Sequence, residues 1–438
     1  MSKALKIQPP QVSSSIEGIL SPQELIHFVR KHSPFYKSLY QDLPDILQLK
    51  DLPLTPQDAF WTANTLPNSK VLTSNLTNGL VLRSGGTTGN PKFSAFTHAE
   101  WKIYTETTGE GFAKGAIDSG DVLANLFPVG NMYGSFIFTT RYLESCPTNV
   151  VQLPIASHIE LSEIPQILQE FQANAIASVP TTLMNFAEHI KKNSLDFNFH
   201  QIKKIFFAGE PLFEDQRKRL KEIFPDAQVF SIGYASVDAG MLGYADRTCK
   251  VNEHRVFSQH TVIEIIDEKT HEVIEKENQE GLIVVTNLYR KLMPIVRYPV
   301  GDRGMWVEKK GNPDRKFKLL GRSEEAACVG GVKFYVHDVR TLLEAYREKL
   351  QIVDFQLLTL HQSKRDCLVI KIASRLPSQK LHQHSQEIIN ELIRVRPLYT
   401  EIIQEGGIEP LQIEWITPDQ LEINPRTGKL RRVSDKRI

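Results

Sequence analysis

Residues 82–92 read LRSGGTTGNPK and follow a short apolar run, GLVLR (79–83), that predicts a strand. Glycine adopts positive φ readily, so Gly85, Gly86 and Gly89 allow successive backbone N–H groups to converge on phosphate oxygens. Further donors come from the side chains of Ser84, Thr87, Thr88 and Lys92. The stretch therefore predicts a phosphate-binding loop, with a flexible Gly/Thr turn as the alternative. It is not a Walker loop, because Phe93 stands where a magnesium-binding hydroxyl is needed.

Around this loop, short apolar runs alternate with amphipathic segments of helix length. The runs downstream are VLANLF (122–127), VVQLP (150–154), AIASV (175–179), KIFFAG (204–209) and QVFSI (228–232). Together with GLVLR, they predict an α/β protein with parallel sheets built from strand-helix-strand units. After about Tyr244 the runs TVIEIID and GLIVVTN predict antiparallel hairpins or a small barrel.

Further out, the pattern divides the chain into unequal parts. Upstream, Ser21 and Glu24 predict a capping box that opens a helix. We expect a large N-terminal domain, residues 1–320, of doubly wound sheets plus a small β-barrel-like part. A hinge linker follows at residues 321–325, and residues 326–438 form a small, mobile α+β domain of ordinary size.

The composition excludes several classes of function. Among 438 residues, 52 are Lys or Arg and 51 are Asp or Glu, so the net charge is +1 and no excess charge attracts nucleic acid or a membrane. The four cysteines form no C-x-x-C pair, which argues against a disulfide framework or a zinc ribbon. The sequence shows neither a signal-peptide pattern nor an apolar run long enough to span a membrane. We expect a cytoplasmic protein.

The loop SGGTTGNPK resembles the S-S/T-G-T-T-G-x-P-K signature of the adenylate-forming superfamily. Later segments resemble that family's further motifs in the same order: FAGEP (207–211), YASVD (234–238), RYPVGDRG (297–304), GRSEEAACVGGVKFYVHDV (321–339) and NPRTGKLRRVSD (424–435). The resemblance covers about Leu25 to Asp435 and is greatest with the phenylacetate-CoA ligase branch. It implies that a carboxylic acid reacts with ATP to give acyl-AMP and pyrophosphate, and that the acyl group then passes to the thiol of coenzyme A.

The resemblance also implies roles for individual residues. Lys429 would bridge the substrate carboxylate and the α-phosphate, and Lys92, Thr87 and Thr88 would act with it in catalysis. The nucleotide (ATP or AMP) would contact Ser84, Gly86, Gly89, Gly209, Glu210, Pro211, Tyr234, Asp302 and Arg322. Asp238 would bind Mg²⁺, which needs only one or two carboxylates beside the substrate phosphates. Glu324 stands at the hinge position, and the acid pocket would include Tyr133, Phe136, Pro180 and Ala235.

Each of these residues also has an ordinary structural interpretation. Lys429 can belong to a solvated basic tail, Asp302 to a turn, and Tyr234 to the core, while Arg322 can be a surface charge. The aromatic residues of the pocket suggest an aromatic or medium-sized apolar acid. Aromatic side chains also simply fill cores.

Four departures from the family's pattern keep other functions open. Gly85 and Val237 each replace a hydroxyl residue, Ala235 replaces a glycine, and Asp238 is one methylene shorter than the usual Glu. A nucleotide-binding homologue that has lost its chemistry is therefore one alternative. Another is an adenylating enzyme that loads a carrier-protein thiol or an amine. A homodimer is also left open.

Overall fold

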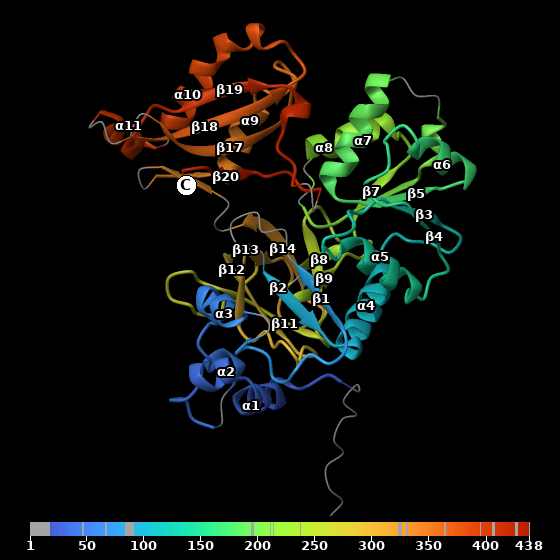
Figure 1. The fold of residues 1–438 in the computed structure, drawn as a ribbon, viewed down its shortest axis with the longest axis vertical. Coiled ribbons are helices and arrows are strands. Elements are labelled where there is room, and N and C mark those ends of the chain that lie inside the picture. The colour runs from blue at the N-terminus through green and yellow to red at the C-terminus, as the bar shows by residue number, and fades with distance from the viewer. Residues whose placement is uncertain are drawn as a thin grey trace, which may run out of the picture.

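A computed structural model gives the fold of the chain. It describes residues 18–45, 48–65, 68–83, 92–193, 197–210, 212, 214–236, 238–322, 326–329, 332–362, 365–394, 396–404, 408–424 and 428–437. Figure 1 shows a C-terminal portion at the upper left, a layered portion with a parallel sheet at the upper right, and an antiparallel sheet with the first three helices below them.

A five-stranded parallel sheet, in the order β4-β3-β5-β6-β7, forms the layered portion. Its strands are β3 (Val122–Asn125), β4 (Val151–Pro154), β5 (Ala175–Ser178), β6 (Lys204–Phe207) and β7 (Gln228–Ser231). On one face, Ile176 and Ile205 pack against three helices: α6 (Ile164–Glu170), α7 (Pro180–Asn193) and α8 (Glu214–Ile223). On the other face, Ala175 and Phe206 pack against α4 (His98–Ala113) and α5 (Ser135–Glu144). Helices cover both faces, as expected of a doubly wound sheet.

The strand predicted at residues 79–83 lies elsewhere. β1 (Leu80–Arg83) pairs antiparallel with β2 (Phe93–Phe96) in a separate two-stranded sheet. The prediction that this run belongs to a parallel sheet was therefore wrong. The connection between the two strands is shorter than the dozen or more residues that a parallel crossover needs, so an antiparallel hairpin is the pairing that the chain length permits.

The predicted barrel-like part is a curled antiparallel sheet in the order β11-β12-β13-β14-β10-β9-β8. Its strands are β8 (Gly233–Ser236), β9 (Gly240–Tyr244), β10 (Glu253–Val256), β11 (Thr261–Ile266), β12 (Glu280–Asn287), β13 (Tyr298–Trp306) and β14 (Lys316–Arg322). The Thr261 hydroxyl of β11 donates to the Met241 carbonyl of β9, so the sheet curls back toward its other end. Its apolar face packs on α1 (Pro22–His32), α2 (Pro34–Leu39) and α3 (Gln57–Ala63). The capping box predicted at Ser21 and Glu24 opens α1.

The C-terminal portion has a hydrophobic core of its own, built from residues between Ala327 and Trp415. A four-stranded sheet in the order β19-β18-β17-β20 carries helices on one side, and a small hairpin lies beside it. Its elements are β15 (Ala326–Val329), β16 (Val332–Tyr335), α9 (Val336–Glu344), β17 (Ile352–Gln362), β18 (Arg365–Ser374), α10 (Ser385–Arg394), α11 (Pro397–Gln404), β19 (Gln412–Ile416) and β20 (Val433–Asp435). This agrees with the α+β expectation. The hinge assignment at residues 321–325 stays a prediction, because residues 323–325 lie outside the described ranges.

Candidate active site

The candidate site lies at the carboxyl edge of the parallel sheet, the edge at which open α/β sheets bind ligands. Three connections that leave β3, β5 and β6 meet a loop of the C-terminal portion there. A Cβ atom placed on Gly428 would lie 2.9 Å from Pro128 Cγ, which follows β3, and 3.4 Å from Thr182 Oγ1, which follows β5. The C-terminal loop is therefore packed closely against the N-terminal portion.

Lys429 extends from this loop to the end of β6. Its Nζ donates a hydrogen bond of 2.5 Å to the carbonyl of Gly209, which has φ +84°. A Cβ atom on Gly209 would lie only 3.2 Å from Lys429 Cε and Nζ, so glycine makes room for the lysine stem. Two residues predicted from separate motifs, 220 positions apart, are thus in direct contact.

Glu210, the next residue, also contacts the C-terminal loop. Its Oε1 accepts from the N–H of Leu430 at 3.0 Å. Its Oε2 accepts from the N–H and the hydroxyl of Thr181, at 3.0 and 2.7 Å. The sequence placed Glu210 beside the nucleotide through its backbone, and the structure adds a side-chain contact between the two portions.

The base of the lysine loop is held by β17. The Gln356 amide donates to the carbonyls of Glu422 and Arg431, at 3.0 and 2.6 Å. Arg432 forms an ion pair with the buried carboxylate of Asp354. Burial alone would raise the pKa of Asp354, but Arg432 and Arg340 outweigh it and hold that pKa well below its ordinary value. These contacts attach the loop to the C-terminal core.

Two further contacts join the portions away from the loop. The Arg219 guanidinium of α8 donates to the Ile352 carbonyl at 2.7 Å. Arg375, at the end of β18, pairs with Glu188 of α7 through Nε at 3.1 Å. With the loop contacts, they fix the relative position in which Lys429 reaches Gly209.

Tyr234 and Asp302, which the resemblance assigned to the nucleotide site, lie together on the curled sheet. The Tyr234 hydroxyl donates to Asp302 Oδ2 at 2.5 Å. In the strand pairing, Asp302 stands opposite Arg322. Behind Tyr234 lies the buried ring of His254, whose Nε2 is 3.0 Å from the Ser231 hydroxyl. Burial lowers the pKa of His254 to about 4, so the ring stays neutral near neutral pH.

Asp238, the predicted metal ligand, is half-buried and oriented by its neighbours. Its Oδ1 accepts from the N–H of Ala239 at 3.2 Å, and its Oδ2 accepts from the Tyr298 hydroxyl at 3.0 Å. Tyr298 in turn accepts from Trp61 Nε1 at 2.8 Å. Lys92 lies over the Trp61 ring, with Nζ 5.1 Å from the centroid. The hydrogen bonds from Trp61 to Tyr298 and from Tyr298 to Asp238 thus join helix α3 to the candidate metal ligand. Lys92 lies at the Trp61 end of this chain.

A fully buried arginine holds the backbone of Asp238. Arg290 donates through Nη1 to the Asp238 carbonyl and through Nη2 to the Ser94 hydroxyl at 2.9 Å. Its guanidinium lies 4.1 Å from the centroid of the Phe96 ring. Because Ser94 and Phe96 belong to β2, Arg290 ties the strand that follows the phosphate loop to Asp238. Sequence reasoning assigned no function to Arg290, Trp61 or Tyr298.

The predicted acid-pocket residues come from three connections. Tyr133 and Pro180 are buried, Phe136 is half-buried and Ala235 is exposed. Residues 130–132 all have positive φ. The Met132 carbonyl accepts from the Arg83 N–H at 2.9 Å, which joins this connection to the strand that precedes the phosphate loop.

Several predicted site residues are outside the described ranges. They are Ser84, Gly86, Thr87, Thr88, Gly89, Pro211 and Glu324, together with Gly85 and Val237, which depart from the family's pattern. Arg322 is described by its backbone in β14.

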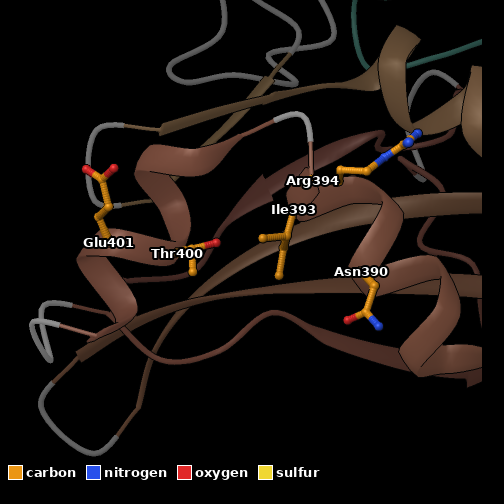
Figure 2. A pocket seen from close by; sticks show the side chains of 5 residues that line it. All are labelled: Asn390, Ile393, Arg394, Thr400 and Glu401. Carbon is orange, nitrogen blue, oxygen red and sulfur yellow. The ribbon is translucent and has the colours of Figure 1, made fainter.

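A hollow of about 440 Å³ lies between α10 and α11 (Figure 2). Its lining residues are Asn390, Ile393, Arg394, Thr400 and Glu401. In Figure 2 the charged side chains of Arg394 and Glu401 point in opposite directions, so they do not converge on one ligand. Neither helix contributes a residue to the site described above.

The family model of the AMP-binding enzymes matches residues 49–289, more than half of the chain. The chain belongs to the AMP-binding enzyme family. Within this family it is similar to the phenylacetate-coenzyme A ligase of Thermus thermophilus, with 23% identity over 439 residues and 95% of each chain covered. It is also similar to the indoleacetate–lysine synthetase of Pseudomonas savastanoi, with 27% identity over 279 residues and 63% of each chain covered. These relatives confirm the predicted phenylacetate-CoA ligase-like branch.

Solved structures confirm the fold of this AMP-binding enzyme. A 2-hydroxyisobutyryl-CoA ligase in its postadenylation state, in complex with 2-HIB-AMP, superposes with a TM-score of 0.71 at 16% identity, covering 99% of this chain and 94% of that one. The same ligase in its thioesterification state gives 0.62 at 18% identity, covering 95% and 88%.

Proposed function

We propose that this AMP-binding enzyme activates a carboxylic acid with ATP, releasing pyrophosphate, and then transfers the acyl group from acyl-AMP to the thiol of coenzyme A. The contact of Lys429 with Gly209 carries the proposal, because it brings a cation of the C-terminal portion to the carboxyl edge of the parallel sheet. Both substrates of the first step are anionic, so their approach requires a cation between them.

The first step uses Lys429 as a mobile cation. In the structure its Nζ binds a neutral carbonyl. A carboxylate or a phosphate is a stronger acceptor for an ammonium group than a carbonyl is. Lys429 would therefore turn from Gly209 to the substrate carboxylate and the α-phosphate, while Lys92 would contact the other phosphates.

Asp238 fits the role of a magnesium ligand. Each of its oxygens accepts one of the hydrogen bonds described above, and a carboxylate oxygen can accept more than one. Magnesium takes one or two carboxylates plus substrate phosphates, which suits a single aspartate. Bound there, Mg²⁺ would neutralise phosphate charge.

The nucleoside would lie over the curled sheet. Asp302, held by Tyr234, has the acceptor oxygens that ribose hydroxyls require. The acid would lie near Tyr133, Phe136, Pro180 and Ala235, and buried aromatic walls favour an aromatic or medium-sized apolar acid. Residues 321–325 would act as the hinge that lets the C-terminal portion, residues 326–438, turn between the two steps.

Transfer to an amine is the second candidate function. The observation in its favour is the 27% identity to indoleacetate–lysine synthetase, whose name describes the joining of an acid to an amine. Whichever acceptor it uses, we propose that the enzyme is cytoplasmic, because its reaction consumes ATP.

A panel of carboxylic acids, read by pyrophosphate release, tests the proposal. We expect release that depends on both ATP and one class of acid, and a thioester when coenzyme A is added. An amide with lysine, without a requirement for coenzyme A, would favour the second candidate. If no acid supports pyrophosphate release, the result would favour a nucleotide-binding homologue that has lost its catalytic activity.

A further inference from the structure

The carboxylate of Glu210 lies where the two portions of the chain meet. It accepts two hydrogen bonds from Thr181, which belongs to the N-terminal portion like Glu210 itself. It accepts the third, at 3.0 Å, from the backbone N–H of Leu430 in the C-terminal loop. The same N–H lies 3.3 Å from the Thr181 hydroxyl. One carboxylate therefore holds the backbone next to Lys429.

Two of these hydrogen bonds lie within the N-terminal portion, and the third joins the two portions. Both Thr181 bonds stay intact wherever the C-terminal portion moves, because their partners share one folded unit. They orient Glu210 before the loop arrives, which lowers the ordering cost of docking. The bond to Leu430 exists only when the lysine loop is in place, and a rotation of the C-terminal portion must break it.

We propose that Glu210, oriented by Thr181, is a positioning residue that latches the lysine loop in the geometry of the first half-reaction. The proposal rests on the proposed function of Lys429. The latch holds the loop backbone at Leu430, whose side chain is buried, and leaves the Lys429 side chain able to turn toward substrate. It acts through position and touches no reacting atom.

The variant Glu210→Gln tests the latch. A glutamine amide can accept from Thr181 through its oxygen, but its NH₂ group then faces the Leu430 N–H, a donor against a donor. With phenylacetate and ATP, we expect pyrophosphate release to fall about 10- to 100-fold, the effect of losing a hydrogen bond to a charged group. Thioester formation from preformed phenylacetyl-AMP and coenzyme A should change less than about twofold, because that step does not use the docked loop.

Two further variants separate the latch from a general loss of structure. Thr181→Val removes the hydroxyl that orients Glu210 and should slow the first half-reaction alone, whereas Thr181→Ser keeps the hydroxyl and should restore it. The matched control is Glu222→Gln, which also converts a carboxylate to an amide in the same portion. Glu222 is exposed and pairs with Lys191 of the neighbouring helix α7, within the N-terminal portion. It should leave both half-reactions unchanged.

Hydrogen exchange at the Leu430 amide provides a readout that needs no turnover. In the ligand-free enzyme we expect exchange in the peptide spanning residues 428–435 to be about tenfold faster in Glu210→Gln than in the wild type. If phenylacetate supports no pyrophosphate release, the proposed function is at fault, and the exchange experiment still decides the latch.

Three results would overturn the proposal: equal loss of both half-reactions in Glu210→Gln and Thr181→Val, full activity in both, or unchanged exchange at Leu430. If Glu210→Gln does not fold, Thr181→Val decides alone, since it keeps the carboxylate.

Discussion

The hydroxyl of Tyr298 offers a direct test of how Asp238 is held. It accepts from Trp61 and donates to Asp238, while its ring packs 5.5 Å from the ring of Phe60. Tyr298→Phe removes the hydroxyl and keeps the ring. Burial, followed by the charge of Asp238, raises the pKa of Tyr298 far above its ordinary value, so in the wild type the hydroxyl donates at every pH used for assay.

The size of the effect follows from the two lost bonds. A hydrogen bond to a charged carboxylate contributes about 1.5–3 kcal/mol, and a buried donor left without a partner costs about 1–3 kcal/mol. In the wild type, the cost of removing the buried Tyr298 hydroxyl from water offsets part of this stabilisation. We therefore expect Tyr298→Phe to lower the stability of the N-terminal portion by about 1–3 kcal/mol. Asp238 also becomes free to rotate. If about half of the lost hydrogen-bond free energy is also lost from transition-state stabilisation, kcat/KM for MgATP falls about tenfold, which corresponds to about 1.4 kcal/mol.

Pyrophosphate release at varied Mg²⁺ and fixed ATP measures this effect. We expect Tyr298→Phe to require more Mg²⁺ for half-maximal rate, and Trp61→Phe to show a smaller change in the same direction. In the double variant the two effects should not add, because both act through one chain of hydrogen bonds. Tyr346→Phe, in the core of the C-terminal portion, is the matched control. An unchanged Mg²⁺ requirement in Tyr298→Phe would refute the idea that this chain orients Asp238.

Three other predictions concern the lysine, its acceptor and a buried histidine. Lys429→Ala should reduce acyl-AMP formation about 100- to 1,000-fold and leave thioester formation from preformed acyl-AMP largely intact; equal loss of both would contradict its role. Gly209→Ala should slow the first half-reaction, because its Cβ meets the Lys429 stem at 3.2 Å and the residue has φ +84°, and full acyl-AMP formation would disprove this. The pKa of His254 is lowered from 6.5 to about 4, so below pH 6.5 the unfolded chain binds a proton that the folded chain does not. Stability should fall as the pH falls from 6.5 toward 4, by up to about 1.4 kcal/mol per pH unit, and His254→Gln should flatten this slope in urea unfolding.

The parallel sheet could be predicted from sequence because its central strands, β5 and β6, are largely buried. Their runs AIASV (175–179) and KIFFAG (204–209) are mostly apolar, and a helix-length segment separates them. The run GLVLR (79–83) has the same appearance and joins a different sheet. Apolar content reports burial, but the choice of partner strand depends on the length of the connection.

Sequence motifs suggested candidate site residues. They did not predict the contacts between residues that are far apart in the sequence. Lys429 and Gly209 come from motifs, although their contact depends on how two cores are placed. Trp61 offers no motif, and its partner Tyr298 lies 237 positions away. An aromatic residue in a helix is ordinary core material, so nothing in the sequence distinguishes Trp61 from its neighbour Phe60. Glu210 does lie in a motif, but its side-chain contact with the N–H of Leu430 joins residues 220 positions apart, which the sequence does not predict.

The separation of the two cores explains how the enzyme can change its active site without unfolding. Among the described residues, the C-terminal core shares none with the N-terminal cores. Polar contacts such as those of Glu210, Arg219 and Arg375 join the two portions. Such contacts each contribute only a few kcal/mol at most, which a substrate-driven rotation can offset. An apolar interface of domain size would hold the lysine more firmly and would also block the second half-reaction. The proposed latch at Glu210 is polar and small, as this argument requires: it would align Lys429 for the first step and release it for the next.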